Sequence, residues 1–185
     1  MAGSPHAGDA GLPADRKVPR RLMRAGGRRG HSLIASGDRR EEDEMTHIGD
    51  MLRTHPRRGS MPVAEVQQTI DAISDCAQSC NSCADACLGE QSVQDLVRWI
   101  RLNTDCADIC VTTAAILMRL TEPDETIIRK QLESCMEACG RCAQECERHA
   151  QHHEHCRLCA EACRRCESAC RAALQGMQAG AQARR

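Results

Sequence analysis

Fifteen cysteines, all between Cys76 and Cys170, are the feature that most constrains the fold of this chain of 185 residues. The sequence holds one tryptophan and neither phenylalanine nor tyrosine. Aromatic side chains bury about 150–250 Å² each and dominate the core of an ordinary domain. The interior of this protein therefore depends on other side chains. Because no export signal is evident, such a density of cysteine favours metal binding over disulfide bonds.

The cysteines recur in alternating steps of three and four residues. These steps are typical of the a and d positions of a helix, which face the axis of a bundle. The sequence therefore predicts thiols along the inner faces of the helices. The expected inward residues are Cys76, Cys80, Cys83 and Cys87 on one helix, Cys106 and Cys110 on the next, Cys135, Cys139, Cys142 and Cys146 on the third, and Cys156, Cys159, Cys163, Cys166 and Cys170 on the fourth.

Capping signals and glycines divide residues 61–177 into four expected helices. Ser92 with Asp95, and Thr121 with Asp124, form capping boxes that open the second and third helices. The expected ranges are Pro62 to Gly89, Ser92 to about Arg119, Thr121 to about Gln151, and a last helix that ends near Gly176. Short turns between long helices favour antiparallel neighbours. We therefore predict an all-α fold, an up-down-up-down antiparallel four-helix bundle with a cysteine-lined core.

The two flanks of this bundle have a different composition. Residues 1–60 carry twelve Lys or Arg against eight Asp or Glu and no sustained apolar period, which predicts a disordered N-terminal extension. Their paired arginines lack the apolar stretch of an export signal. Met45 is a candidate natural start, because the preceding Arg40–Glu44 segment back-translates to a purine-rich ribosome-binding site; a genuine basic tail is the alternative. Residues 178–185 are expected to form a flexible C-terminal tail.

Two uses of the cysteines other than metal binding fit the pattern poorly. Cysteine can act as a small apolar core residue, but Leu or Ile would bury more area at each position. Disulfides within a helix would be strained, since neighbouring Cβ atoms lie about 5–6 Å apart and a disulfide needs about 3.5–4.5 Å. Cross-helix disulfides remain conceivable, although the number of cysteines is odd.

An all-thiolate environment suits Cu(I), Zn(II) or an iron–sulfur cluster. Zinc sites are usually closed sets of four ligands, and iron–sulfur ligands follow loop spacings that end in proline. Cu(I) accepts two or three thiolates, and neighbouring ions can share sulfurs, which suits a continuous lining. One Cu(I) per thiolate also leaves the buried core nearly neutral. Cu(I) is favoured, with an iron–sulfur or zinc-binding redox or electron-transfer bundle as the alternative.

The repeated helical cysteine runs, Cys76–Cys87 and Cys135–Cys146, the extended run Cys156–Cys170 and the segment Asp105–Cys110 resemble the copper storage proteins over about Met61 to Met177. This resemblance implies a non-enzymatic protein that holds about one Cu(I) per cysteine, or roughly fifteen ions per protomer. It also implies a homotetramer, and the missing twin-arginine signal points to the cytosolic (cytoplasmic) type. Partners would be copper donors or acceptors such as a copper chaperone or small thiols.

The first and third turns of such a bundle lie at the same end. Four histidines fall there, beside Cys87, Cys146 and Cys156, and we call this the histidine end: His149, His152, His153 and His155. Our hypothesis is that this end is the entrance and that its imidazoles receive or relay Cu(I); a solvated turn with incidental histidines is the alternative. The opposite end of the helices carries apolar side chains that are expected to close the core.

Charge and hydropathy add two expectations. The net charge of −1 gives no indication of a nucleic-acid partner. No run of 18 or more apolar residues occurs in the sequence, so no membrane span is expected.

Overall fold

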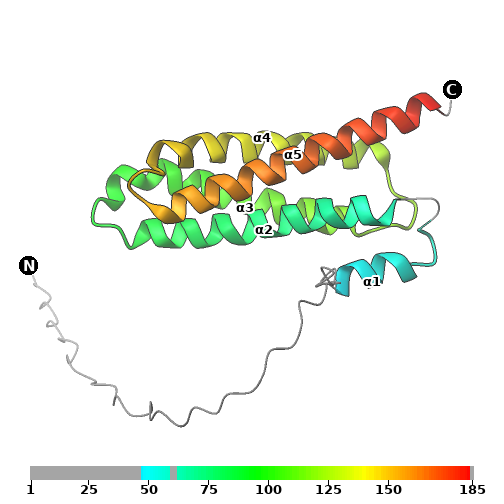
Figure 1. The fold of residues 1–185 in the computed structure, drawn as a ribbon, viewed down its shortest axis with the longest axis horizontal. Helices are drawn as coiled ribbons and strands as arrows, with labels where there is room; N and C mark the ends of the chain where they lie inside the picture. The colour runs from blue at the N-terminus through cyan, green and yellow to red at the C-terminus, as the bar shows by residue number, and fades with distance from the viewer. Residues whose placement is uncertain (1–46, 59–61, 184–185) are drawn as a thin grey trace, which may run out of the picture. The chain divides into compact units, whose positions relative to one another are not determined.

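The computed structural model describes residues 47–58 and 62–183, and every regular element in these ranges is helical (Figure 1). A short first helix precedes four long ones, and a single turn of 3-10 helix leads into the second of these. The elements are α1 (His47–Thr54), α2 (Val63–Leu88), η1 (Val93–Leu96), α3 (Val97–Leu117), α4 (Glu125–His149) and α5 (Glu154–Ala183).

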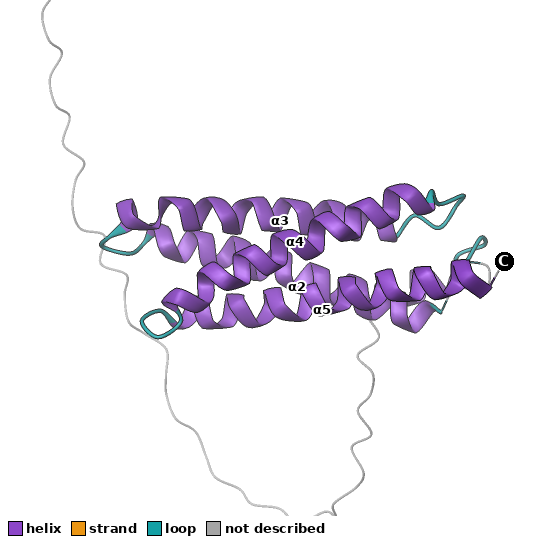
Figure 2. Ribbon diagram, turned by 90° about the horizontal axis from the view of Figure 1, so that it is seen from above, coloured by secondary structure: helices purple, strands orange, loops and turns teal. Residues whose placement is uncertain are grey.

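The four long helices form one antiparallel bundle. Each packs against two neighbours, in the ring order α2, α3, α4, α5, and Figure 2 shows them running side by side over most of their length. Consecutive helices are joined by short turns, so the chain runs up, down, up and down. The predicted all-α, up-down-up-down architecture is confirmed.

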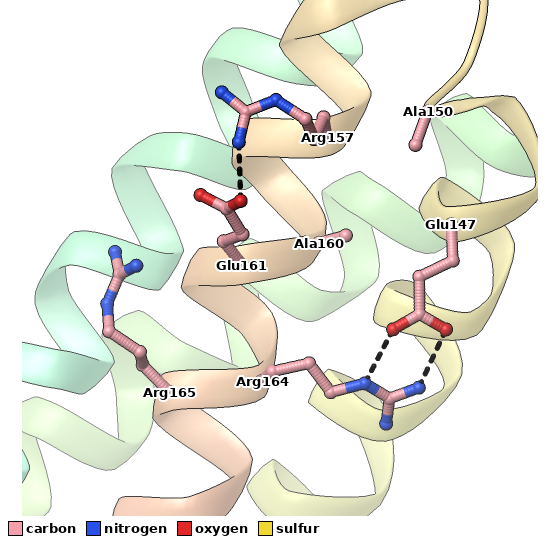
Figure 3. A pocket seen from close by; sticks show the side chains of 7 residues that line it. All are labelled: Glu147, Ala150, Arg157, Ala160, Glu161, Arg164 and Arg165. Carbon is pink, nitrogen blue, oxygen red and sulfur yellow. Dashed lines mark hydrogen bonds and ion pairs between the residues drawn. The ribbon is translucent and has the colours of Figure 1, made fainter.

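The sequence pattern explains which face of each helix is buried. The a and d positions face the axis, and the positions between them carry charged residues that form ion pairs on the outside. Arg164 of α5 binds Glu147 of α4 with Nε–Oε1 and Nη2–Oε2 distances of 2.8 and 3.0 Å (Figure 3), and Arg165 of α5 binds Asp75 of α2 at 2.6 Å. Exposed pairs of this kind contribute up to about 1 kcal/mol each.

Two helix boundaries differ from the capping prediction. At the start of α4 the cap is Asp124, whose side chain accepts hydrogen bonds from the backbone N–H groups of Thr126 and Ile127 at 2.8 and 3.1 Å, so Thr121 lies outside the helix. Ser92 makes no side-chain cap bond, because the chain first turns through η1 before α3 begins at Val97. The expected α3 capping box is therefore wrong.

The C-terminal helix is longer than the sequence suggested. α5 passes through Gly176 and continues to Ala183, so residues 178–183 are helical and not a flexible tail. A glycine inside a helix costs only about 1 kcal/mol, which the surrounding alanines and glutamines tolerate. Glycine alone was therefore too weak a stop signal.

One helix, α1, lies within the segment that was expected to be disordered. Ile48 and Leu52, spaced i,i+4, form its apolar face, and Leu52 is only 4% exposed as part of the buried core cluster. This short amphipathic stretch was overlooked because the surrounding sequence is strongly charged. The candidate start at Met45 and the rest of residues 1–46 lie outside the described residues.

The end of the bundle opposite the histidines is apolar, as predicted. Ile70 and Ile73 of α2 and Leu132 of α4 are at most 1% exposed, and Leu174 of α5 is also buried. Val66, Leu117 and Ile128 pack against this cluster. The thiol lining is therefore closed at this end by aliphatic side chains.

Candidate metal centre

All fifteen cysteines are free thiols and all are buried, with none more than 2% exposed. α2, α4 and α5 contribute four, four and five of them, and α3 contributes two. The prediction of a cysteine-lined core is confirmed, including the lower density of thiols on α3.

Sulfur atoms from different helices are in mutual contact along the axis. The Sγ atom of Cys163 lies 3.6 Å from that of Cys76 and 3.5 Å from that of Cys80. On the other side of the core, Cys139 lies 3.7 Å from Cys106 and 3.6 Å from Cys110. These separations are far longer than the disulfide bond of about 2.05 Å, and they form a continuous path of sulfur between four helices.

Asn103 occupies the inward position of α3 above its two cysteines. It is fully buried, and its carboxamide oxygen accepts hydrogen bonds from the thiols of Cys142 and Cys159 at 2.9 and 3.3 Å. Its Nδ2 group donates to the sulfur of Cys83 at 3.5 Å. The buried carboxamide thus has its partners, and all of them are thiols.

A second polar residue on α3, Thr113, is also fully buried. Its hydroxyl donates to the carbonyl of Ile109 at 2.7 Å and accepts from the side-chain amide of Gln131 at 3.0 Å. The amide comes from α4, so this bond joins two helices below the thiols. Thr113 has a structural role and contacts no sulfur in these bonds.

Burial in the metal-free core favours the neutral thiol. Burial, followed by the neighbouring Cys156, raises the pKa of Cys87 to about 12. Hydrogen bonds with Cys135 and Cys166, and then burial, raise the pKa of Cys170. A metal ion that binds here therefore displaces protons from the sulfurs it takes.

His155 is the histidine that the structure brings into the thiol lining. Its Nδ1 atom lies 3.1 Å from the Sγ atom of Cys156 and 3.4 Å from that of Cys83. Its other nitrogen, Nε2, lies 3.3 Å from a carboxylate oxygen of Glu90. An ionised carboxylate only accepts hydrogen bonds, so Nε2 carries the proton and Nδ1 offers its lone pair to the core.

Glu90, in the turn between α2 and η1, was not singled out from the sequence. The same carboxylate oxygen also accepts from His153 Nδ1 at 2.9 Å. The hydrogen bond from His155, together with the charge and hydrogen bond of His153, holds the pKa of Glu90 below its usual value. An acidic residue in the turn that faces a cluster of histidines was the available signal.

The other two histidines of this end have different surroundings. His149 stacks on Trp99, with ring centroids 3.8 Å apart, and Trp99 donates its indole N–H to the sulfur of Cys146 at 3.3 Å. His152 is exposed in the turn. The predicted group of four therefore divides into one residue at the thiols, two that pack around Trp99 or Glu90, and one in solvent.

Several groups of these side chains have the geometry of a metal site. Within each group the ligand atoms lie within 4.8 Å of one another; two of the groups are Cys76, Cys110, Cys139 and Cys166, and Cys80, Cys142, Cys159 and Cys163. A third group combines Cys83, Cys87 and Cys156 with His155.

A surface hollow between α4 and α5 has a different character (Figure 3). Glutamates and arginines line it, and its arginines already have partners: Arg157 pairs with Glu154 and Glu161, and Arg164 with Glu147 and Glu167. No thiol reaches this hollow, so the chemistry of the molecule is concentrated in the core.

Fold and core together define a class of protein, a four-helix bundle whose axis is lined with thiols that can ligate soft metal ions. A family model described as copper storage protein (Csp) matches residues 63–175. The chain belongs to the copper storage protein family.

Two solved structures of copper storage proteins are similar to this chain. The copper storage protein Ccsp from Streptomyces lividans, loaded with 10 copper equivalents, is 48% identical, with a TM-score of 0.68 over 70% of this chain and 98% of that chain. A cytosolic copper storage protein from Streptomyces lividans with five coppers is 49% identical, with a TM-score of 0.60 over 60% of this chain and 93% of that chain.

A curated relative is YhjQ of Bacillus subtilis (strain 168), an uncharacterized cysteine-rich protein. It is 36% identical over 70 residues, which are 38% of this chain and 61% of YhjQ. The chain therefore matches about three-fifths of the length of that relative. None of the helices in the described residues is long and apolar enough to cross a membrane.

Proposed function

We propose that this protein is a cytosolic store for Cu(I), which it holds as many ions on the thiolates of its core and does not turn over chemically. The observation that carries this function is the lining of fifteen buried thiols, contributed by four helices. The similar Streptomyces lividans structures that hold five and 10 copper equivalents support it, and one of them is a cytosolic protein.

The spacing of the sulfurs suits ions that share ligands. Taking the zinc–sulfur bond of about 2.3 Å as a guide, two sulfurs on one ion lie at most about 4.6 Å apart. The contacts between Cys135 and Cys166 at 3.9 Å and between Cys80 and Cys142 at 3.8 Å satisfy this limit without backbone movement. Each Cu(I) replaces one thiol proton, so a filled core stays close to neutral and avoids the cost of buried charge. The expected capacity is about one ion for each of the fifteen cysteines.

The histidine end is the proposed entrance for Cu(I). His155 presents Nδ1 to Cys83 and Cys156, where an arriving ion would gain two thiolates and one imidazole. Glu90 accepts a hydrogen bond from Nε2 and so fixes the orientation of the ring. Carboxylates commonly hold metal-binding histidines in this way. The remaining members, His149, His152 and His153, are proposed to assist as a group. The buried side chains that close the opposite end are aliphatic.

Two variants test this entrance. We expect His155→Ala to slow the first phase of loading from a Cu(I)–chelator complex by tenfold or more, because the first site loses its imidazole. His47→Ala is the matched control, since His47 is exposed on α1 and lies outside the histidine end. Equal loading rates for His155→Ala and the unchanged protein would contradict the entrance role.

We further propose a homotetramer and exchange of copper with a chaperone or small thiols. Apolar side chains that an interface would cover remain on the surface of the described chain: Val97 and Val111 on α3 are 59% and 56% exposed. Light scattering on the purified protein tests the tetramer, and a monomer at all concentrations would contradict it.

Metal analysis distinguishes storage from the alternative of a redox bundle. The protein is purified anaerobically from its host after growth with excess copper or excess iron. We expect many copper ions per chain in the first case and no visible cluster absorbance in the second. Iron and sulfide in a fixed ratio, with visible absorbance, would instead establish an iron–sulfur protein.

A further inference from the structure

The metal-free core contains sets of four thiols whose spacing suits one tetrahedral ion. Four spheres in mutual contact surround a tetrahedral hole, and for an edge of about 3.8 Å the distance from hole to sphere centre is about 2.3 Å, the length of a Zn–S bond. Cys80 lies 3.8 Å from Cys142, 3.8 Å from Cys159 and 3.5 Å from Cys163, and these four form one of the candidate groups. Thiols packed at contact distance in this way leave room for a tetrahedral ion.

Three of the candidate groups share no residue, so all three can be filled at once. We call them the lower, middle and upper groups. The lower group is Cys76, Cys110, Cys139 and Cys166. The middle group is Cys80, Cys142, Cys159 and Cys163. The upper group is Cys83, Cys87, Cys156 and His155.

The contacts within the other two groups are similar. In the lower group, Cys139 lies 3.7 Å from Cys76 and 3.6 Å from Cys110. In the upper group, His155 Nδ1 lies 3.4 and 3.1 Å from two of the sulfurs, close to the edge of about 3.6 Å expected for one imidazole and one thiolate on a tetrahedral zinc ion. The donor sets are Cys₄ twice and Cys₃His once, which are the usual sets of structural zinc sites.

We propose that in the absence of Cu(I) this core binds three Zn(II) ions, one in each of the lower, middle and upper groups. Binding exchanges protons for metal without any redox step. Zn(II) in a Cys₄ group displaces four thiol protons and leaves a complex of charge −2, and Zn(II) in the upper group displaces three and leaves a charge of −1. The inference does not depend on copper storage, since it uses only the geometry of the metal-free core.

Charge sets the order of filling and the result of competition. The lower and middle groups are wholly buried, where an uncompensated charge is costly. The upper group carries less charge and includes His155, whose side chain is 26% exposed. The upper group therefore fills first. Four thiolates with four Cu(I) ions are neutral, so Cu(I) displaces Zn(II) from the deep groups and releases it.

The test is a titration of the full, reduced, metal-free chain with Zn(II) against a chromogenic zinc chelator. We expect saturation at three equivalents. Co(II) serves as the spectroscopic probe and should give the visible bands of tetrahedral thiolate coordination. Cys139→Ala removes a ligand of the lower group and Cys142→Ala one of the middle group, and each should saturate at two. Cys170→Ala, which belongs to none of the three groups, is the control and should keep three.

The same preparation is titrated with Cu(I) so that the two ideas can fail separately. Octahedral Co(II) spectra, saturation at one equivalent, or removal of all Zn(II) by a weak chelator would overturn the three-site proposal even if the Cu(I) capacity is high. Three Zn(II) equivalents with no multiple Cu(I) binding would support it and overturn copper storage. Because an alanine variant can fail to fold, circular dichroism is recorded for each, and the stoichiometry and Co(II) spectrum of the unchanged chain decide the matter without the variants.

Discussion

Alkaline pH should destabilise the metal-free bundle while leaving the copper-loaded bundle unaffected. Burial raises the pKa of Cys87 from 9.0 to about 12. The folded state therefore keeps a proton that the unfolded chain loses above about pH 9, so this contribution to stability is complete below pH 9 and disappears as pH rises towards 12. One such thiol costs about 1.4 kcal/mol per pH unit in this window, or about 2 kcal/mol at pH 10.5.

The composition makes the effect measurable. The chain has no tyrosine and only two lysines, Lys17 and Lys130, so apart from the thiols few groups titrate between pH 9 and 12. Anaerobic urea unfolding, followed by far-ultraviolet circular dichroism at pH 8, 9 and 10.5, gives the free energy of unfolding. We expect the free energy of unfolding to fall as pH rises. In Cys87→Ala its slope against pH should be smaller, by the amount that one proton contributes. A free energy of unfolding that is constant or rises over this range would refute the neutral buried thiols.

Three substitutions test the fold itself by urea unfolding at pH 7. Ile73→Ala should lower the free energy of unfolding by about 2–5 kcal/mol, because Ile73 is fully buried in the apolar end. Ile127→Ala, at a position 57% exposed, is its control, and an equal loss in both would argue against that end as a closed core. Gly140→Ala should raise the free energy of unfolding by about 1 kcal/mol, since a Cβ atom there meets the Glu167 carboxylate at 3.6 Å. A loss of stability would mean that α4 and α5 pack too closely at this point for a Cβ atom. Asp124→Ala should lower the free energy of unfolding by about 1 kcal/mol, because α4 loses its N-cap. An unchanged free energy would show that this cap does not stabilise the fold.

The bundle and its lining were predictable because one physical rule governs both. Inward positions of a helix recur every three or four residues, and the cysteines follow this period on α2, α4 and α5, so their burial followed from spacing alone. Helix ends were predicted less well. Ser92 has the sequence of a cap, but a turn of 3-10 helix places it away from the first turn of α3, and Gly176 is accommodated inside α5.

The details of the core depend on contacts between distant residues, which a periodic pattern does not contain. Asn103, for example, bonds to Cys83, Cys142 and Cys159, and these bonds depend on how three other helices pack around it. Likewise, four histidines near one turn looked equivalent, and only the fold shows that His155 reaches the sulfurs. The division of the thiols into groups also required their relative positions.

The capacity of the core for Cu(I) tests the account of this protein most directly. The reduced, metal-free chain is titrated anaerobically with Cu(I) in the presence of a strong competing chelator, and the free chelator complex is followed by absorbance. A thiol-lined store predicts that binding saturates near one equivalent per cysteine, close to fifteen per chain. Saturation at one or two equivalents would contradict storage and indicate a discrete site in its place.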